Sequence, residues 1–260
     1  GRRHSRAAVF PIGIDVEQVR TMVAEGGDSR SVRRLRQSLL ERPLVIGVDR
    51  LDYSKGLPER FRAYGHLLAR YPETIGRVVY LQVAQPSRED VPEYHTLRLQ
   101  LDGIAGEING RYAEFDWVPM RYLNKGYARP TIMNFLALAR VGLVTPLRDG
   151  MNLVAKEYVA AQNPEDPGVL VLSRFAGAAE QMGEALLVNP FSREELSDAI
   201  QRALTMPLAE RKRKWETLME VVRDTDVGIW RDDFVSTLRA IESGTACDDA
   251  GVPTGADPRV

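Results

Sequence analysis

The chain has 260 residues, with 35 Lys and Arg against 36 Asp and Glu, a formal net charge of -1 and 44% hydrophobic residues. This composition is ordinary for a globular protein and excludes a wholly disordered or collagen-like chain. The near balance of charge argues against a dedicated nucleic-acid binder. The single cysteine, Cys247, excludes an internal disulfide and a cysteine cluster for zinc.

The sequence carries no sign of membrane insertion or secretion. No apolar run approaches the roughly 18 to 20 residues needed to cross a bilayer. The first residues, GRRHSR followed by AAVFPIGID, are basic but lack the apolar centre of a signal peptide. We therefore expect a cytoplasmic protein with no membrane partner.

Short apolar runs alternate with longer amphipathic ones along the chain. We expect strands at 9–12, 44–48, 78–84, 115–118, 141–145, 169–172 and 185–188. We expect helices at 31–40, 57–71, 91–109, 131–139, 151–162, 192–204, 209–223 and 227–241. Near-continuous apolar strands are typical of a parallel sheet that is buried on both faces.

The alternation predicts an α/β fold with a Rossmann-like, doubly wound parallel sheet. Ser192, with Glu195 three residues later, predicts a capping box at the start of one helix. The last 18 residues are rich in Gly, Pro and Asp and show no periodicity. The expected organisation is a flank at 1–8, a Rossmann-like domain at 9–226, a C-terminal helix at 227–242 and a disordered tail at 243–260.

Two cations follow the expected strand 44–48. Arg50 and Lys55 lie in the sequence DRLDYSKG, just before a helix. A guanidinium offers a planar fork to phosphate oxygens and an ammonium a compact charge, so the two could neutralise a diphosphate leaving group. The alternative is a solvated loop in which Asp52 and Lys55 form a surface ion pair. The loop matches neither GxxxxGK[ST] nor GxGxxG, so no Walker A loop or dinucleotide fingerprint is supported.

A third cation, Arg88, follows the expected strand 78–84 in the sequence PSRED. Because ligands of such sheets bind beyond the carboxyl ends of the strands, Arg88 would face the same crevice as a further anion contact. The alternative is a surface residue at a helix entry, with Ser87 or Asp90 as the N-cap.

The segment 145–158, TPLRDGMNLVAKEY, leaves the expected strand 141–145 through a Gly-containing turn into a helix. Free backbone N–H groups of the first helical turn form an anion site, and Asp149 beside them would accept protons from hydroxyl groups. A carboxylate there suits a sugar or ribose diol. Asp149, Leu153 and Glu157 recur every four residues and are expected along one side of the helix. The alternative makes Asp149 a cap and Glu157 an i,i+4 partner on a solvated face.

Two further patterns are weaker. The D-x-D sequence at 224–226 could indicate a metal-dependent transferase, but it follows a helix rather than a strand and arises often by chance. The histidines His4, His66 and His95 fall outside the three loops, and we expect His66 and His95 on helix surfaces.

Three segments carry a resemblance to a known family. VDRLDYSKGLPERF, QVAQPSRED and above all TPLRDGMNLVAKEYVAAQ resemble the nucleotide-sugar-binding half of the trehalose-6-phosphate synthase family, retaining glycosyltransferases of family 20. The likeness extends from FPIGID at 10–15 to about residue 241. Family members have two Rossmann-like domains facing each other across a cleft, the GT-B architecture. Because this chain resembles the second domain only, the resemblance implies a fragment, either truncated or natural.

The resemblance also implies roles for the matching residues. Arg50 and Lys55 would bind the donor diphosphate and stabilise it as it leaves, and Asp149 would bind hydroxyls of the transferred glucose. Arg88 would contact the phosphate of the acceptor. The other implied donor contacts are the backbone amides of Gly150, Met151 and Asn152, the side chains of Leu153 and Val154, Glu157 at the ribose and Tyr127 near the base.

The implied reaction transfers glucose from a nucleoside-diphosphate glucose to glucose 6-phosphate with retention, by a front-face route in which the leaving diphosphate helps to deprotonate the acceptor. No metal or other cofactor is expected. The expected partners are the nucleotide-sugar, glucose 6-phosphate and a missing N-terminal domain, while self-association into a homo-oligomer stays open. The choice among UDP, ADP and GDP is also open, and we expect the chain alone to be inactive.

Two alternatives differ from this interpretation. One is a related GT-B transferase, such as a pseudo-glycosyltransferase that couples cyclitols, which the same nucleotide-binding half could serve. The other is a catalytically idle module that binds a nucleotide or a partner subunit. Ligand titration separates the idle module from a donor site, and the sequence of the other half would separate the two transferases.

Overall fold

The computed structural model describes residues 7–87 and 91–242. Its centre is a six-stranded parallel sheet in the order β3-β2-β1-β4-β5-β6. The strands are β1 (Leu44–Arg50), β2 (Val79–Gln85), β3 (Met120–Leu123), β4 (Val141–Val144), β5 (Val169–Ser173) and β6 (Leu186–Val188). The chain builds outward from β1 in one direction and then from β4 in the other, so the switch point lies between these two strands. The expected doubly wound α/β fold is confirmed.

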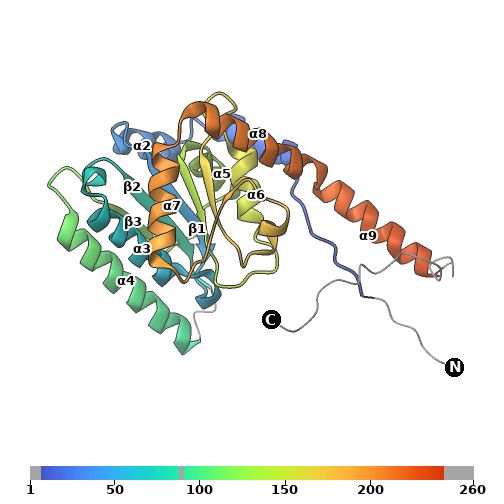
Figure 1. The fold of residues 1–260 in the computed structure, drawn as a ribbon, viewed down its shortest axis with the longest axis horizontal. Helices are drawn as coiled ribbons and strands as arrows, with labels where there is room; N and C mark the ends of the chain where they lie inside the picture. Colours follow the sequence, from blue (N-terminus) through green and yellow to red (C-terminus); the bar gives the residue numbers. More distant parts are fainter. Residues whose placement is uncertain (1–6, 88–90, 243–260) are drawn as a thin grey trace.

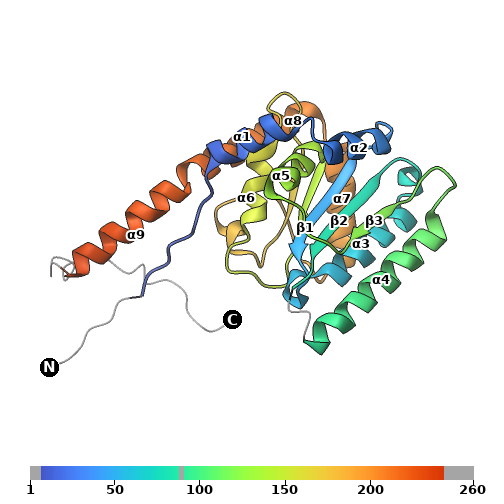
Figure 2. The same cartoon turned by 180° about the vertical axis from the view of Figure 1, so that it is seen from behind.

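Helices cover both faces of the sheet. On one face lie α3 (Leu57–Arg70), α4 (Pro92–Tyr112) and α7 (Arg193–Thr205) (Figure 1). On the other lie α1 (Val16–Gly26), α2 (Arg30–Leu39), α5 (Arg129–Leu138), α6 (Leu153–Ala161) and α8 (Leu208–Asp224) (Figure 2). The last helix, α9 (Val227–Glu242), extends away from this body. Three short 3-10 turns complete the described elements: η1 (Tyr53–Lys55), η2 (Pro72–Thr74) and η3 (Gly177–Glu180).

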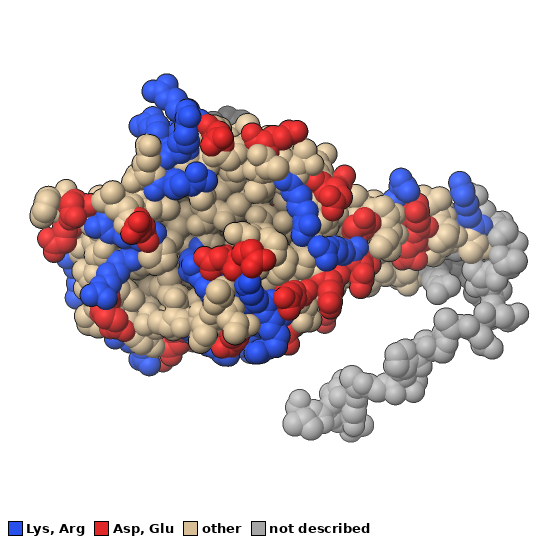
Figure 3. Space-filling model, turned by 90° about the horizontal axis from the view of Figure 1, so that it is seen from above, with Lys and Arg blue, Asp and Glu red and all other residues tan. Residues whose placement is uncertain are grey.

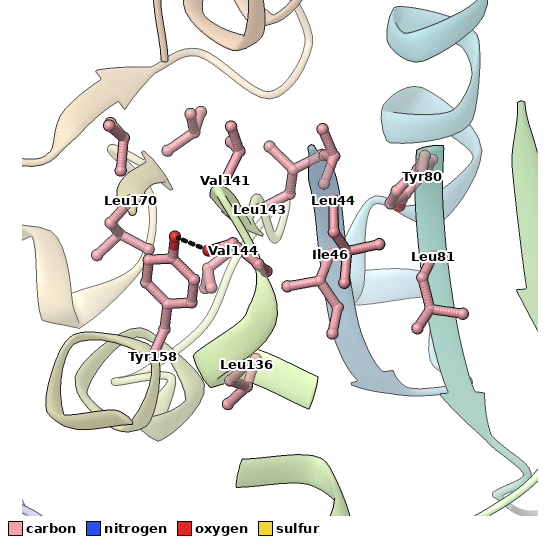
Figure 4. Packing of buried hydrophobic residues seen from close by; sticks show 14 of the residues in the cluster. Leu44, Ile46, Tyr80, Leu81, Leu136, Val141, Leu143, Val144, Tyr158 and Leu170 are labelled. Carbon is pink, nitrogen blue, oxygen red and sulfur yellow. Dashed lines mark hydrogen bonds between the residues drawn. The ribbon is translucent and has the colours of Figure 1, made fainter. Parts of the chain in front are cut away.

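The core forms where the central strands meet the helices (Figure 4). Ile46 of β1, Leu143 of β4 and Leu170 of β5 are all buried, as expected for strands covered on both faces. The ring of Tyr158 on α6 packs against these strands, and its hydroxyl donates to the carbonyl of Ala139 at 3.1 Å. This bond satisfies a polar group that burial would otherwise leave without a partner.

Two expected strands are absent from the described sheet. Residues 9–12 form no strand: Val9 is exposed, and the ring of Phe10 packs against Phe234 of α9, with centroids 5.2 Å apart. Residues 115–118 form a turn in which Phe115 is fully exposed and Glu114 bridges to Trp117. The edge strand β3 begins only after this turn. Apolar composition alone therefore misplaced both strands.

The helices differ from expectation mainly at their ends, with one exception. The helix α1 was not expected; Asp15 begins it by accepting a hydrogen bond from the Gln18 amide at 2.8 Å. The expected capping residue Ser192 does accept from the Glu195 amide, at 3.2 Å. α4 continues three residues beyond the expected end, to Tyr112.

Residues 10–14, which precede α1, pass over the junction between α8 and α9. The carbonyl of Ile14 accepts from the amide of Val227 at 3.2 Å. A Cβ atom on Gly13 would lie 1.9 Å from the carbonyl oxygen of Thr225, so only glycine permits this approach. We call this contact between residues 10–14 and 225–234 the crossing. The expected tail at 243–260 lies outside the described residues, and the division of the chain at residue 226 stays a prediction.

Candidate active site

Three loops meet at the carboxyl ends of the strands, the lower edge of the sheet in Figure 1. The loop after β1 is joined to the loop after β4, because the carbonyl of Ser54 accepts from the amide of Leu147 at 2.8 Å. The amide of Asp149 donates in turn to the carbonyl of Phe175, in the loop after β5, at 3.2 Å. The main chain thus fixes the three loops relative to one another before any ligand binds.

The loop after β1 is built by local polar contacts. The Asp52 carboxylate accepts hydrogen bonds from both the amide and the hydroxyl of Ser54, and Asp52 thereby caps η1. Gly56 then turns the chain into α3 with a φ of 66°, and a Cβ there would lie 2.6 Å from the carbonyl oxygen of Thr145. Only glycine meets both demands. Lys55 is therefore presented from a rigid turn between two buried elements.

Lys55 and Asp149 form the central contact of the site. The Lys55 ammonium lies 2.5 Å from Asp149 Oδ2, and both side chains are largely buried, with 15% and 18% of their surfaces exposed. Asn152 donates to the same carboxylate oxygen at 3.1 Å. Asp52 is occupied by its turn, so the alternative surface pair between Asp52 and Lys55 does not form.

Arg50 is the last residue of β1 and is exposed at the same edge. No carboxylate of the described residues forms an ion pair with its guanidinium. Its charge is therefore unpaired within the described residues, at the same edge of the sheet as the ion pair of Lys55 and Asp149, and it is available to a phosphate.

The turn before α6 presents main-chain donors. Asn152 has a φ of 74°, and α6 begins at Leu153 rather than at the expected residue 151. Among the described residues, no group accepts a hydrogen bond from the backbone amides of Gly150, Met151 and Asn152. Because Asp149 precedes the helix, the expected alignment of Asp149 with Leu153 and Glu157 along one helix face is wrong.

The half-buried side chains of Leu153 and Val154 lie in the first turn of α6, and Glu157 follows one turn later. Arg129, at the start of α5, donates to Glu157 Oε1 at 3.0 Å and to the side chain of Gln18 at 2.6 Å. Burial raises the pKa of Glu157, and the nearby Arg129 partly opposes this. The alternative in which Glu157 lies on a solvated face is not what the structure shows.

Tyr127 lies between β3 and α5, at the same end of the sheet. Its ring packs edge-on against Phe135, with centroids 5.4 Å apart, and the ammonium of Lys125 lies 5.1 Å from its centroid. Tyr127 is thus held by these two contacts but is only half-buried, which leaves part of its surface open to a ligand. Arg88, the expected acceptor contact, lies outside the described residues, and Val91 rather than Ser87 is the N-cap of α4.

The weaker sequence patterns have structural roles. Asp226 accepts from the amide of Ile229 at 2.8 Å and so begins α9. His66 contacts the hydroxyl of Ser197 at 3.0 Å, and His95 is exposed on α4. Across residues 7–87 and 91–242, no three His, Cys, Asp or Glu side chains are grouped so that they could hold a metal ion. In the same ranges no helix is long and apolar enough to span a bilayer.

Sequence reasoning missed two parts of the site. Arg129 was not expected, although an arginine at a helix start close to Tyr127 was a usable signal. The segment after β5 was also missed because it carries few charges. Its Gly177 lies so close to the preceding loop that a Cβ would be 2.0 Å from the carbonyl oxygen of Gly150. An unexplained glycine after a buried strand was the only trace of this contact in the sequence.

Comparison with known proteins places these features in a family. The model of glycosyltransferase family 20 matches residues 1–240. A trehalose-6-phosphate synthase of Sodalis glossinidius is 49% identical over 237 residues, which are 91% of this chain and 50% of that protein. The chain thus spans about half the length of the curated relatives it matches.

Solved structures agree with this comparison. A UDP-forming α,α-trehalose-phosphate synthase of Burkholderia xenovorans in complex with glucose 6-phosphate is 49% identical, with a TM-score of 0.88 over 90% of this chain and 52% of that one. The Escherichia coli enzyme bound with UDP-2-fluoro glucose is 48% identical, with a TM-score of 0.87 over the same share of this chain and 52% of its own. The fold is therefore that of one Rossmann-like domain of a GT-B glycosyltransferase. From its matched residues and its structure, the chain belongs to glycosyltransferase family 20.

Proposed function

We propose that the chain is the donor-binding half of an α,α-trehalose-phosphate synthase. The whole enzyme would transfer glucose from a nucleoside-diphosphate glucose to the anomeric hydroxyl of glucose 6-phosphate with retention. The observation that carries this proposal is the contact of Lys55 with Asp149 at the edge of the sheet where Arg50 ends β1 as an exposed cation. It joins a phosphate-binding group and a hydroxyl-binding group at one sheet edge, as a sugar diphosphate requires.

The charged side chains would bind different parts of the donor. Arg50 and Lys55 would bind the diphosphate oxygens, and Asp149 would accept hydrogen bonds from hydroxyls of the transferred glucose. The unused amides of Gly150 and Met151, with that of Asn152, would add donors at the same place. A diphosphate that binds Lys55 also competes with Asp149 for it, which leaves the carboxylate open to the sugar.

The nucleoside would lie along α6. Leu153 and Val154 would line its site, and Glu157, already buried beside Arg129, would accept from the ribose hydroxyls. Tyr127 would contact the base with the open part of its ring. Among UDP, ADP and GDP we propose UDP, because the two solved relatives described above form UDP or bind a UDP-sugar.

The chemistry follows from where charge develops. As the glycosidic bond breaks, negative charge grows on the diphosphate, and two fixed cations stabilise it more strongly than they stabilise the intact donor. The leaving diphosphate would take the acceptor proton on the same face of the sugar, which gives retention. Arg88 would contact the phosphate of glucose 6-phosphate. We further propose that Arg50 and Lys55 supply the charge neutralisation without a metal ion, and that the enzyme acts in the cytoplasm.

The test is calorimetric titration of the chain with UDP-glucose and UDP, with ADP and GDP for comparison. The wild-type chain should bind UDP-glucose more tightly than UDP, because Asp149 contacts the glucose. Asp149→Asn should remove this difference, and it should not weaken UDP, because it frees Lys55. Asp116→Asn is the matched control, since Asp116 is an exposed, ion-paired aspartate at the opposite end of the sheet.

The outcomes separate the candidate functions. A wild-type chain that binds none of these ligands at millimolar concentration would refute the proposal and favour an idle module. Equal losses of UDP-glucose and UDP in Asp149→Asn would place the sugar elsewhere.

A further inference from the structure

Arg60, on α3, is a fully buried cation that the proposed chemistry does not use. Its side chain has 0% exposed surface and forms an ion pair with Asp49 of β1, whose own side chain is 3% exposed. It lies directly behind the edge where the donor would bind, because Asp49 is the residue before Arg50. A charge so completely removed from water is costly unless each of its donors is satisfied.

All three nitrogens of the guanidinium are bound, and their partners come from four elements. Nη1 donates to Asp49 Oδ2 at 2.6 Å and to Gln82 Oε1, on β2, at 3.0 Å. Nε donates to the hydroxyl of Thr145, just after β4, at 2.8 Å. Nη2 donates to the carbonyl of Lys55 at 3.3 Å. One planar group thus connects β1, the middle of β2, the residue that follows β4, and the turn η1.

Two of these four contacts are made to the loops of the candidate site. Lys55 is bound through its own carbonyl, and Thr145 begins the loop that carries Asp149. The ammonium of Lys55 and the carboxylate of Asp149 are themselves 2.5 Å apart. The relative position of these two groups therefore depends on a third group that both loops contact from behind.

The sheet makes room for this arrangement. A Cβ on Gly47 of β1 would lie 2.3 Å from Gln82 Oε1 and 2.5 Å from Arg60 Nη1. Glycine weakens a strand interior and is otherwise unexplained there. A well-packed apolar side chain could fill such a space with equal or greater stability. The fold therefore keeps a costly polar group whose contacts converge on the site.

We propose that Arg60 is a positioning residue for the donor diphosphate: it holds Lys55 and the Asp149 loop at the separation that a sugar diphosphate requires, without touching the ligand. This inference rests on the proposed function, since it takes Lys55 as a diphosphate contact. It differs from a purely structural role in one respect. Loss of Arg60 should weaken ligands that carry a diphosphate and should leave the nucleoside contacts along α6 in place.

The test compares UDP with uridine by calorimetry in matched lysine variants. Arg60→Lys keeps the charge beside Asp49 but is too short and too compact to contact Thr145 and Lys55 as well. Arg211→Lys is the control, because Arg211 is another buried arginine, paired with Asp166 at 2.7 Å at the opposite end of the sheet. Thermal unfolding of both variants measures the purely structural cost.

Arg60→Lys should lower the affinity for UDP by about tenfold, as expected for the loss of one charge-assisted contact, while uridine stays within about twofold of wild type. Arg211→Lys should lower the melting temperature and leave both affinities unchanged. An Arg60→Lys chain with the wild-type ratio of UDP to uridine affinity would overturn the proposal, and so would equal losses of both ligands.

A second variant keeps the test decisive if Arg60→Lys does not fold. Thr145→Val removes only the acceptor for Nε and preserves the shape of the side chain. It should shift the preference for UDP in the same direction by a few-fold, and an unchanged preference would overturn the proposal. If the wild-type chain itself binds neither ligand, the proposed function fails, and the role of Arg60 fails with it; the wild-type titration therefore distinguishes the two failures.

Discussion

Lys55 and Asp149 neutralise each other across two loops of the candidate site. Each is the only ion-pair partner of the other among the described residues, and both are largely buried. Removing one of them should therefore have two effects: it deletes a proposed ligand contact and it leaves the other charge without its partner. Arg50 differs, because it is exposed and has no ion-pair partner among the described residues. Its removal should therefore delete only a proposed ligand contact.

This contrast leads to a prediction for the two cations. Arg50→Ala and Lys55→Ala should each weaken binding of UDP by about 1.5 to 3 kcal/mol, the usual range for a charge-assisted contact, and should weaken uridine far less. Lys55→Ala should also lower the free energy of unfolding, because Asp149 loses its partner. Calorimetry with both ligands and thermal unfolding measure these effects.

The control for this pair is Arg77→Ala, an exposed arginine just before β2, at the amino ends of the strands. It should change neither affinity. A loss of UDP and uridine by the same factor in Arg50→Ala would indicate damage to the base pocket rather than a lost phosphate contact.

Glu157 leads to a prediction about pH. Its carboxylate would accept hydrogen bonds from ribose hydroxyls more strongly when it is ionised, and burial raises its pKa, with partial opposition from Arg129. The affinity for uridine should therefore fall as the pH is lowered through this raised pKa, at a higher pH than an ordinary glutamate would require. Titrations of uridine, which has no phosphate to titrate, over a series of pH values measure this.

The matched variant is Glu157→Gln, which keeps the shape of the side chain and cannot ionise. Its affinity for uridine should be lower at neutral pH and should not change over the same range. A pH profile identical to that of wild type would show that another group is responsible.

At the scale of elements, the sequence predicted the central strands and most helices, because their apolar periodicity arises from burial on both faces of the sheet. It failed where an apolar run packs on something other than a strand. The run at 9–12 packs on α9, and the run at 115–118 makes a turn with an exposed ring. It also missed α1, whose cap is a single hydrogen bond accepted by Asp15. Tertiary contacts, absent from any local pattern, decide these cases.

The helix α4 contains glycines that its packing does not require. A Cβ on Gly103 or Gly106 would meet nothing within 4 Å, and both residues are exposed. Gly103→Ala and Gly106→Ala should each raise the free energy of unfolding by about 0.5 to 1 kcal/mol, because alanine restricts the unfolded chain and favours the helix. Denaturant unfolding measures this. Gly47→Ala, which places a methyl group against Arg60, should instead destabilise the chain.

The buried Lys156 on α6 leads to a prediction about stability and pH. Its ammonium donates to the carbonyl of Ile12 at 3.2 Å and to the hydroxyl of Thr225 at 3.1 Å, and burial lowers its pKa to about 8. The unfolded chain keeps this proton up to the ordinary pKa of lysine, near 10.4. Between these values the unfolded state binds more protons, so this group makes the fold more stable as the pH rises.

Lys156→Met removes this contribution. The free energy of unfolding of wild type relative to Lys156→Met should therefore increase from pH 8 to about pH 10, by on the order of 1 to 3 kcal/mol, since each pKa unit corresponds to about 1.4 kcal/mol. Denaturant unfolding of both chains at several pH values measures the difference, and other titrating groups cancel in it. A difference that does not change with pH would contradict the prediction.

At the scale of the whole molecule, the candidate site lies at the end of the sheet with the carboxyl termini of the strands. The end with the amino termini of the strands carries both signs interspersed over its surface (Figure 3). At the other end, residues from three separate loops, 94 positions apart for Lys55 and Asp149, meet in one site. The positions of Lys55 and Asp149, each after a strand, were enough to predict that their two loops meet, while the loop after β5 was not predicted. The fixed separation of the loops was not predictable, since it depends on contacts such as those of Gly177 and Arg60.

The final prediction concerns activity. The 260-residue chain alone should bind nucleotide weakly and form no trehalose 6-phosphate, because transfer needs the acceptor hydroxyl within about 3 to 3.5 Å of the anomeric carbon. The one acceptor contact proposed for this half, from Arg88, would not be enough to orient a hexose phosphate, and water in an open cleft weakens each electrostatic contact. An assay with UDP-glucose and glucose 6-phosphate measures product. Robust turnover by the purified chain would contradict the interpretation that it is half of an enzyme.

The crossing has a consequence for the order in which the chain assembles. Phe10 and Trp230 are joined by a hydrogen bond of 3.1 Å although 220 positions separate them, and Gly13 packs directly against Thr225. A contact between such distant positions closes a loop that contains the whole sheet, and the entropy of that closure is recovered only after the strands have paired. During synthesis, α9 leaves the ribosome after every strand is complete. We therefore expect the crossing to form last and to open first. In hydrogen exchange, the amides of Val227 and Trp230 should exchange with water sooner than those of β1 and β4.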